Sequence, residues 1–414
     1  MSKADRLGGA ISGCRERAAR FLEGQVYNEG EKQYWRHSPN HRPEANQSHL
    51  LYGTWAGALA SVLLHGDIQI EAGRKRQIGN ALRSFQLPDG TFVMPGVTDA
   101  ATHPCDNEYF AFHCTNYALG ALRALGEEPR YPLTFVETLR SRPQLEEWLS
   151  RRDWSRPWRE GNNVVNLASF YDVVARDGGD WARERLIDLA DWHDRHQGRT
   201  TGFWHAGDAT NRTALFDAMA GAAHNLHIYY TLEREVPRAK VIVDSCLRLG
   251  YMGIRSACAD IDLVDILVNL RRFGHRIGEI DRMLGRYLVE LLQVQRSDGG
   301  FCDSYVTPSN CYGYVTPARM SLTWTTWFRL ATIGMVTCVI RPQDRKRWAF
   351  RNTLGLGYFN APLAFDNGTP LSTASEALTR ARLKRAWLAT VREARFARQR
   401  ATWQGRQLIG RAAH

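Results

Sequence analysis

The chain has 414 residues, 44% of them hydrophobic and 23% charged, which is the composition of a globular protein with a sizeable core. No run of about 18 apolar residues is free of charge, which excludes a membrane-spanning helix. Residues 1–21 contain no apolar signal-peptide segment, so we expect a cytoplasmic protein. The net charge is +11, but residues 380–411 hold ten Lys or Arg and one Glu, so the rest of the chain is nearly neutral. This distribution argues against a body that binds nucleic acid.

Six segments are apolar almost all round and rich in small residues. A helix that is apolar on every side is buried on every side, so these segments predict six buried helices. The six segments are 49–63, 107–122, 162–175, 216–232, 260–270 and 318–333.

An amphipathic segment precedes each buried one. These segments are 12–24, 73–86, 137–150, 182–196, 237–249 and 280–295. Three stretches, 78–92, 186–204 and 287–303, pass from an amphipathic helix into a Gly-containing turn closed by an aromatic residue. The repeat is about 54 residues long. Six buried helices alternating with six amphipathic ones predict an all-α fold, a single (α/α)6 toroid over residues 5–345.

Two further segments follow the predicted toroid. Residues 346–373 are rich in Pro, Gly and Asn and predict a wrapping loop. Residues 374–414 predict a basic helical tail with a narrow apolar face that includes Trp387 and Leu388. We expect residues 380–411 either to bind an anionic membrane surface peripherally or to pack along the outside of the toroid.

Polar side chains cluster near the starts of the six buried helices. In a ring of helical hairpins these starts converge on a central funnel, where they line a binding site, although Asp and Asn are also common helix caps. The polar set is His49, Tyr52, Asn107, Tyr109, His113, Asn162, Asn163, Asn166, Asp217, His224, His227, Asp260, Asp262, Asp265, Arg319 and Thr323. The residues predicted to bind a small-molecule or oligosaccharide substrate are Trp55, Tyr109, His113, Asn163, Asp217, His224, Arg319, Trp324 and Trp327.

The acidic sequence Asp260-Ile-Asp262-Leu-Val-Asp265, followed by a Gln-Val-Gln-Arg-Ser-Asp-Gly-Gly-Phe turn at 293–301, resembles the terpenoid cyclase and protein prenyltransferase toroid superfamily. In class II terpene cyclases a DxDD motif opens an inner helix, and similar Gln-containing turns close the outer helices. The resemblance implies that Asp262 is the proton donor and that Asp260 is the first Asp of the motif. Leu263 occupies the fourth position of the motif and departs from it.

The implied reaction is the cyclisation of a linear isoprenoid, started by protonation of an alkene. It requires a carboxylic acid that stays protonated near neutral pH, which burial and a neighbouring carboxylate provide. Asp260 and Asp262 share one helical turn, with Asp265 as a third negative neighbour. The competing interpretation is that these acids cap and stabilise the start of a helix.

His113 also resembles the zinc-ligand histidine of prenyltransferase β-subunits. Asp298 and Cys302 lie in a loosely comparable place, but their spacing differs. We predict no metal and no cofactor. The alternative interpretation of His113, His224 and His227 is that they are hydrogen-bonded core or funnel histidines.

The same toroid serves carbohydrate chemistry, which leaves further hypotheses open. Polysaccharide lyases and uronate epimerases move a proton with Tyr and His and neutralise a carboxylate with Asn or Arg, roles open to Tyr109, His113, Asn163, His224 and Arg319. The toroid is also consistent with a glycoside hydrolase and with a non-catalytic binding module. A closed aromatic cavity with Asp262 at its end favours cyclisation, an open polar groove favours glycans, and a filled centre favours a binding module.

Overall fold

The computed structural model describes residues 3–65, 70–95, 107–206, 209 and 211–350. Helices dominate this part of the chain, and the strands in it are two to four residues long. The all-α prediction is confirmed.

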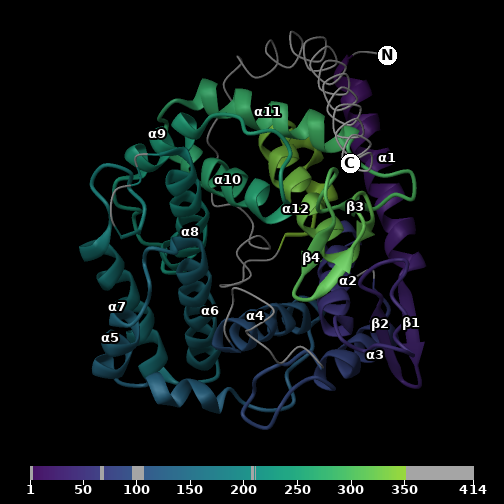
Figure 1. Cartoon of the computed structure of the whole chain (residues 1–414), viewed down its shortest axis with the longest axis horizontal. Helices are drawn as coiled ribbons and strands as arrows, with labels where there is room; N and C mark the ends of the chain where they lie inside the picture. Colours follow the sequence, from purple (N-terminus) through teal and green to yellow (C-terminus); the bar gives the residue numbers. More distant parts are fainter. Residues whose placement is uncertain (1–2, 66–69, 96–106, 207–208, 210, 351–414) are drawn as a thin grey trace, which may run out of the picture.

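Six buried helices occupy the centre of the molecule. They are α2 (Leu50–His65), α4 (Asn107–Leu125), α6 (Pro157–Arg176), α8 (Arg212–Thr231), α10 (Ala257–Leu270) and α12 (Thr323–Ile340). Each packs against the next in this order, and α12 packs against α2, so the contacts form a closed cycle (Figure 1). This is the order of contacts that the predicted toroid requires. Burial on all sides explains why these segments are apolar all round; in α10, for example, every residue except Cys258 is buried.

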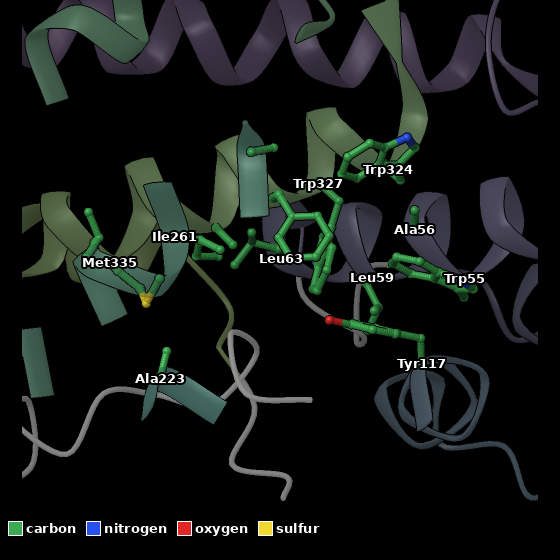
Figure 2. Packing of buried hydrophobic residues seen from close by; sticks show 14 of the residues in the cluster. Trp55, Ala56, Leu59, Leu63, Tyr117, Ala223, Ile261, Trp324, Trp327 and Met335 are labelled. Atoms are coloured by element: carbon green, nitrogen blue, oxygen red, sulfur yellow. The ribbon is translucent and has the colours of Figure 1, made fainter. Parts of the chain in front are cut away.

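Two tryptophans that were predicted to bind substrate are part of this core. Trp55 stacks on Tyr117 with ring centroids 4.4 Å apart, and Trp327 meets Trp55 edge-on at 5.4 Å (Figure 2). Both tryptophans are fully buried. At this depth the two rings pack the helices against one another, and neither lines the cavity described below.

Six amphipathic helices lie outside the buried ones. They are α1 (Lys3–Gly24), α3 (Ala72–Arg83), α5 (Arg142–Ser150), α7 (Asp180–His196), α9 (Ala239–Leu249) and α11 (Ile277–Gln293). α1, α3, α7, α9 and α11 each contact the buried helix that follows, and α5 contacts α7. In α11 the buried side chains Ile280, Leu284, Tyr287, Leu288 and Leu291 follow the spacing of a single apolar stripe.

Two helix boundaries differ from the prediction for local reasons. The segment 137–150 is split into a 3₁₀ helix, η2 (Thr134–Leu139), and α5, because Ser141 and Gln144 form a capping box that starts a new helix. α12 begins at Thr323 and not at 318, because Arg319 has a φ of 68° and Ser321–Leu322 form the short strand β6.

Short antiparallel strands, which the sequence analysis did not predict, extend two of the connections. β1 (Val26–Glu29) pairs with β2 (Lys32–Trp35). β3 (Phe301–Cys302) pairs with β6, and β4 (Ser309–Cys311) pairs with β5 (Tyr314–Thr316). The two residues between β4 and β5 are Tyr312 and Gly313, with φ of 50° and 84°, which is the backbone of a tight hairpin turn.

The described chain ends with the 3₁₀ helix η4 (Pro342–Arg347), which packs on α12. Most of the predicted wrapping loop (346–373) and all of the predicted basic tail (374–414) lie outside the described residues, so membrane binding by 380–411 stays a prediction. Within the described ranges, no helix is both long enough and apolar enough to cross a membrane.

Each of the three repeated turns has a glutamine at the equivalent position, where the turn begins. Each amide Nε2 donates two hydrogen bonds, one to a Gly carbonyl of its own turn and one to the next outer segment along the chain or, for the last turn, to the first outer helix. Gln86 reaches Tyr131 O at 2.8 Å, Gln197 reaches Pro237 O at 2.8 Å, and Gln295 reaches Cys14 O of α1 at 2.9 Å. The third bond closes the ring, because it joins the last outer helix to the first.

In two of the turns, the aromatic residue that closes the turn forms a hydrogen bond to the following buried helix. The backbone N–H of Phe92 donates to Thr115 Oγ1 of α4, and that of Phe301 donates to Thr326 Oγ1 of α12. Gly299 has a φ of 92°, and a Cβ there would collide with the backbone of Arg17 in α1. The turns after α3 and α11 therefore fix these outer helices both to another outer segment and to the following buried helix.

Replacing Gln197 with Ala leaves the carbonyls of Gly202 and Pro237 without their donor and removes the acceptor of Arg238. We expect the free energy of unfolding to fall by about 2–3 kcal/mol. Gln77→Ala, at an exposed position of α3, is the control and should cost less than about 0.5 kcal/mol. Urea unfolding followed by circular dichroism measures both changes; equal effects would contradict the bridging role.

Candidate functional site

A cavity of about 210 Å³, partly open to solvent, lies where the six buried helices converge. Every one of these helices contributes to its wall. Its lining residues are Tyr52, Tyr109, His113, Tyr117, Trp158, Asn162, His224, Cys258, Asp303, Asn310, Cys311, Tyr312, Trp324 and Phe328. Of the predicted binding residues, the structure brings together Tyr109, His113, His224 and Trp324.

The segment from Asp303 to Tyr312 closes one side of the cavity, and the sequence analysis did not assign it a role. Asp303 accepts a hydrogen bond from the N–H of Ala257 at the start of α10 and another from Ser309 Oγ in β4. The Tyr312 ring packs 4.5 Å from Phe110 and 5.8 Å from His113. Tyr312 holds a left-handed conformation that is unfavourable for a residue with a Cβ, a kind of strain often found at functional sites.

His113 is held in the cavity wall by two polar partners. Asn162 Nδ2 donates to its Nδ1 at 3.5 Å, so the neutral ring carries its hydrogen on Nε2, which lies 3.0 Å from Tyr52 Oη. Burial lowers the pKa of His113 to about 3. Burial also raises the pKa of Tyr52 well above its usual value. At neutral pH the cavity therefore presents a neutral imidazole and a neutral phenol in contact.

His224 also lines the cavity and lies next to Asp262. Its Nε2 is 4.0 Å from Asp262 Oδ1. Burial lowers the pKa of His224 to about 3. Asp262 itself is fully buried and does not line the cavity, although Cys258, one turn earlier in α10, does. Asp262 therefore lies behind the cavity wall, next to the lining residue His224.

Asp260, the second predicted catalytic acid, belongs to a buried ion pair. It pairs with Arg329 of α12 and accepts the backbone N–H of Arg255 at 3.0 Å. Burial raises the pKa of Asp260, and the charge of Arg329 opposes that shift. Ser256, and not Asp260, is the N-cap of α10, because it accepts the N–H of Ala259, and Asp260 lies in the first turn of the helix. Asp260 joins α10 to α12.

Three other predicted binding residues lie away from this cavity. Asn163 is buried beside Glu160 and donates to its carboxylate. Asp217 lines a separate cavity of about 50 Å³. Arg319 is exposed and donates to the carbonyl of Tyr305. With Arg319 outside the cavity, the described residues that line it include no Lys or Arg.

The zinc-site alternative is not supported by the geometry. Asp298 accepts from the N–H of Gly300 and from Ser321 Oγ, and neither Asp298 nor Cys302 lines the cavity with His113. Across the described ranges, no group of three or more His, Cys, Asp or Glu side chains is placed to hold a metal ion.

Comparison with known proteins assigns no family. No protein-family model matches the chain, and no curated protein matches its sequence. The resemblance to terpenoid cyclases stays a prediction from the acidic sequence of α10 and the repeated turns.

Buried histidines support the β4–β5 hairpin that carries Tyr312. The rings of His37 and His49 pack 4.8 and 5.1 Å from the ring of Tyr314 in β5, and His49 Nε2 lies 3.0 Å from Tyr312 O. The N–H of His37 donates to His41 Nδ1. Burial lowers the pKa of all three histidines, and that of His49 falls to about 4.

These shifts predict acid sensitivity. A histidine whose pKa is lower in the folded state than its unfolded value of about 6.5 stabilises the fold less as pH falls, because the unfolded chain takes up the proton first. Between pH 6 and pH 4.5, we expect His49→Gln to reduce the slope of unfolding free energy against pH by about 1.4 kcal/mol per unit. Chemical denaturation at several pH values measures the slope, with the partly exposed His275→Gln as control. An unchanged slope in His49→Gln would show that His49 does not take part.

Proposed function

We propose that the cavity is the active site of an enzyme that cyclises or isomerises a linear, largely apolar isoprenoid after protonating one of its double bonds. The observation that supports this proposal is the composition of the wall. No Lys or Arg is among the described residues that line this small space. Seven of the lining side chains are aromatic: Tyr52, Tyr109, Tyr117, Trp158, Tyr312, Trp324 and Phe328. Apolar surface binds hydrocarbon, and aromatic faces attract the positive charge of a carbocation.

The initiating proton comes from the Asp262–His224 pair. Asp262 is fully buried, so His224 is the member that meets the substrate and Asp262 acts as a positioning residue and proton source behind it. The proton adds to one alkene carbon and leaves a carbocation on the other. Attack by a second double bond on this cation closes a ring, and the Asp262 carboxylate is left negative.

The final proton is taken up by His113, the second histidine that lines the cavity. His113 is neutral at physiological pH, because burial lowers its pKa to about 3, so its Nδ1 can accept a proton from the product cation in place of the long hydrogen bond from Asn162. Its Nε2 contact with Tyr52 keeps the ring in place. Substrate and product are isomers, since one proton enters and one leaves, and solvent then restores Asp262 and His113.

A neutral glycan is the second candidate, for one specific reason. The cavity is partly open, and Asn162, Asn310 and Asp303 give it groups that hydrogen-bond to hydroxyls beside aromatic faces on which sugars stack. A uronate substrate is less well supported, because the described lining offers no cation for its carboxylate.

The full-length protein in D₂O should convert a linear isoprenoid alcohol into a cyclic isomer that contains one solvent deuterium, as detected by mass spectrometry. His224→Gln and Asp262→Asn should each lower kcat by about 100-fold or more, because each removes a partner of the transferred proton. Asp244→Asn, on the outer helix α9, should keep wild-type activity.

A product without solvent deuterium would reject protonation of an alkene. Turnover of a neutral oligosaccharide that is lost in His113→Asn, with no turnover of isoprenoids, would instead establish the second candidate.

A further inference from the structure

The cavity has a mouth and a floor that differ in exposure. On α4 the lining residues Tyr109, His113 and Tyr117 are four residues apart, so they follow one another along one side of the helix. Tyr109 is partly exposed, whereas Tyr117 is 4% exposed. At 1.5 Å per residue, Tyr117 lies about 12 Å further along the helix axis than Tyr109. On α12, Trp324 is the second residue, and Phe328, which is 1% exposed, lies one turn further in.

Aromatic rings close the floor of the cavity. The rings of Tyr117 and Phe328 meet edge-on with their centroids 6.3 Å apart. Behind them lie Trp55, stacked 4.4 Å from Tyr117 (Figure 2), and Trp327, whose ring is 4.5 Å from that of Phe328. Both tryptophans are fully buried and neither lines the cavity, so the cavity ends at the first layer of rings. A chain that enters the cavity therefore stops against Tyr117 and Phe328.

The mouth of the cavity carries hydrogen-bonding groups. Asn310 is exposed and Asp303 is partly exposed, and both belong to the segment that closes one side of the cavity. Asp303 is the only described lining residue with a formal charge when histidine is neutral. It accepts hydrogen bonds from the N–H of Ala257 and from Ser309 Oγ, which leaves further lone pairs on its carboxylate. The mouth can therefore accept a hydrogen bond from a ligand hydroxyl, whereas it repels an anionic group.

The size of the cavity limits the hydrocarbon that fits between the mouth and the floor. An apolar cavity of about 150 Å³ holds one benzene ring. The cavity of about 210 Å³ therefore has room for roughly eight to ten carbon atoms. Each additional buried methylene group strengthens binding about fourfold, until the chain is longer than the cavity.

We propose that the cavity binds its substrate tail-first: the hydrocarbon end lies on Tyr117 and Phe328, and a neutral hydroxyl head lies at Asp303 and Asn310. Phe328 and Asp303 are thus specificity-determining residues, one for chain length and the other for the charge of the head group. The inference rests on the proposed function, because it names the isoprenoid substrate as a short, uncharged alcohol and not a phosphorylated one. In this orientation the middle of the chain lies beside the two lining histidines, as the proposed reaction requires.

Calorimetric titration of the full-length protein with straight-chain primary alcohols, from butanol to tetradecanol, tests the floor without any turnover. In the wild-type protein we expect the affinity to rise about fourfold per carbon and to level off at roughly eight to ten carbons. Phe328→Ala should move this limit to alcohols that are a few carbons longer, because it opens space at the floor. Phe170→Ala removes another fully buried ring, one that does not line the cavity, and is the matched control that should leave the limit unchanged.

A second titration compares decanol with decyl phosphate, which has the same chain and an anionic head. The wild-type protein should bind the alcohol about tenfold more tightly or better, because the charge of Asp303 repels the phosphate. Asp303→Asn should reduce this preference, because it removes the formal charge and keeps the shape of the side chain. An undiminished preference in Asp303→Asn, with circular dichroism unchanged, would show that Asp303 does not select the head group.

Three results in the wild-type protein would overturn the proposal even if the variants failed to fold: no binding of any alcohol, affinity that keeps rising to tetradecanol, or equal binding of decanol and decyl phosphate. Equal limits in Phe328→Ala and Phe170→Ala, with both variants folded, would also overturn it. If the titrations agree with the proposal but no isoprenoid is turned over, the binding mode is established and the proposed reaction alone is rejected. If an isoprenoid is cyclised but the affinity shows no limit, the reaction stands and the binding mode is rejected.

Discussion

The glutamine at the start of each repeated turn makes the hydrogen bonds on which the rest of the structure depends. Gln86, Gln197 and Gln295 each satisfy one carbonyl of their own turn and one carbonyl of a neighbouring outer segment. Neighbouring hairpins are thereby held at a fixed distance, and the bond from Gln295 to α1 closes the cycle. Because the hairpins are fixed at this outer layer, the starts of the buried helices meet at one place, and side chains far apart in sequence enclose a single cavity.

The buried centre of the molecule holds ionisable side chains among its apolar residues. Asp260 is neutralised by Arg329 and joins two helices, whereas Asp262 and Asp265 face histidines of α8. Stability alone does not require buried carboxylates beside histidines, and such groups gather at sites that move protons. The aromatic wall and the His–Asp contacts between α8 and α10 meet at His224, which belongs to both.

The sequence was sufficient for the helices and insufficient for the site. Periodicity located the buried and outer helices because burial on all sides or on one side leaves a direct composition signal. It could not place Trp55 or Trp327, because a buried tryptophan and a cavity tryptophan have the same local pattern. Asp260 looked catalytic because its partner Arg329 lies 69 residues away and pairs with it only in the folded chain. The hairpin that brings Tyr312 to the cavity has one local signal, the glycine at 313 that permits its tight turn.

If the cavity accepts an apolar chain, as proposed, fluorescence should report the binding of one. Trp158 and Trp324 line the cavity, so an apolar ligand should change their emission. A linear isoprenoid alcohol is predicted to alter the fluorescence of the wild-type protein in a saturable way and to have no such effect on a Trp158→Phe, Trp324→Phe double variant, with a neutral oligosaccharide inactive in both. A saturable change that is equally large in the double variant, or one produced by the oligosaccharide alone, would contradict the account.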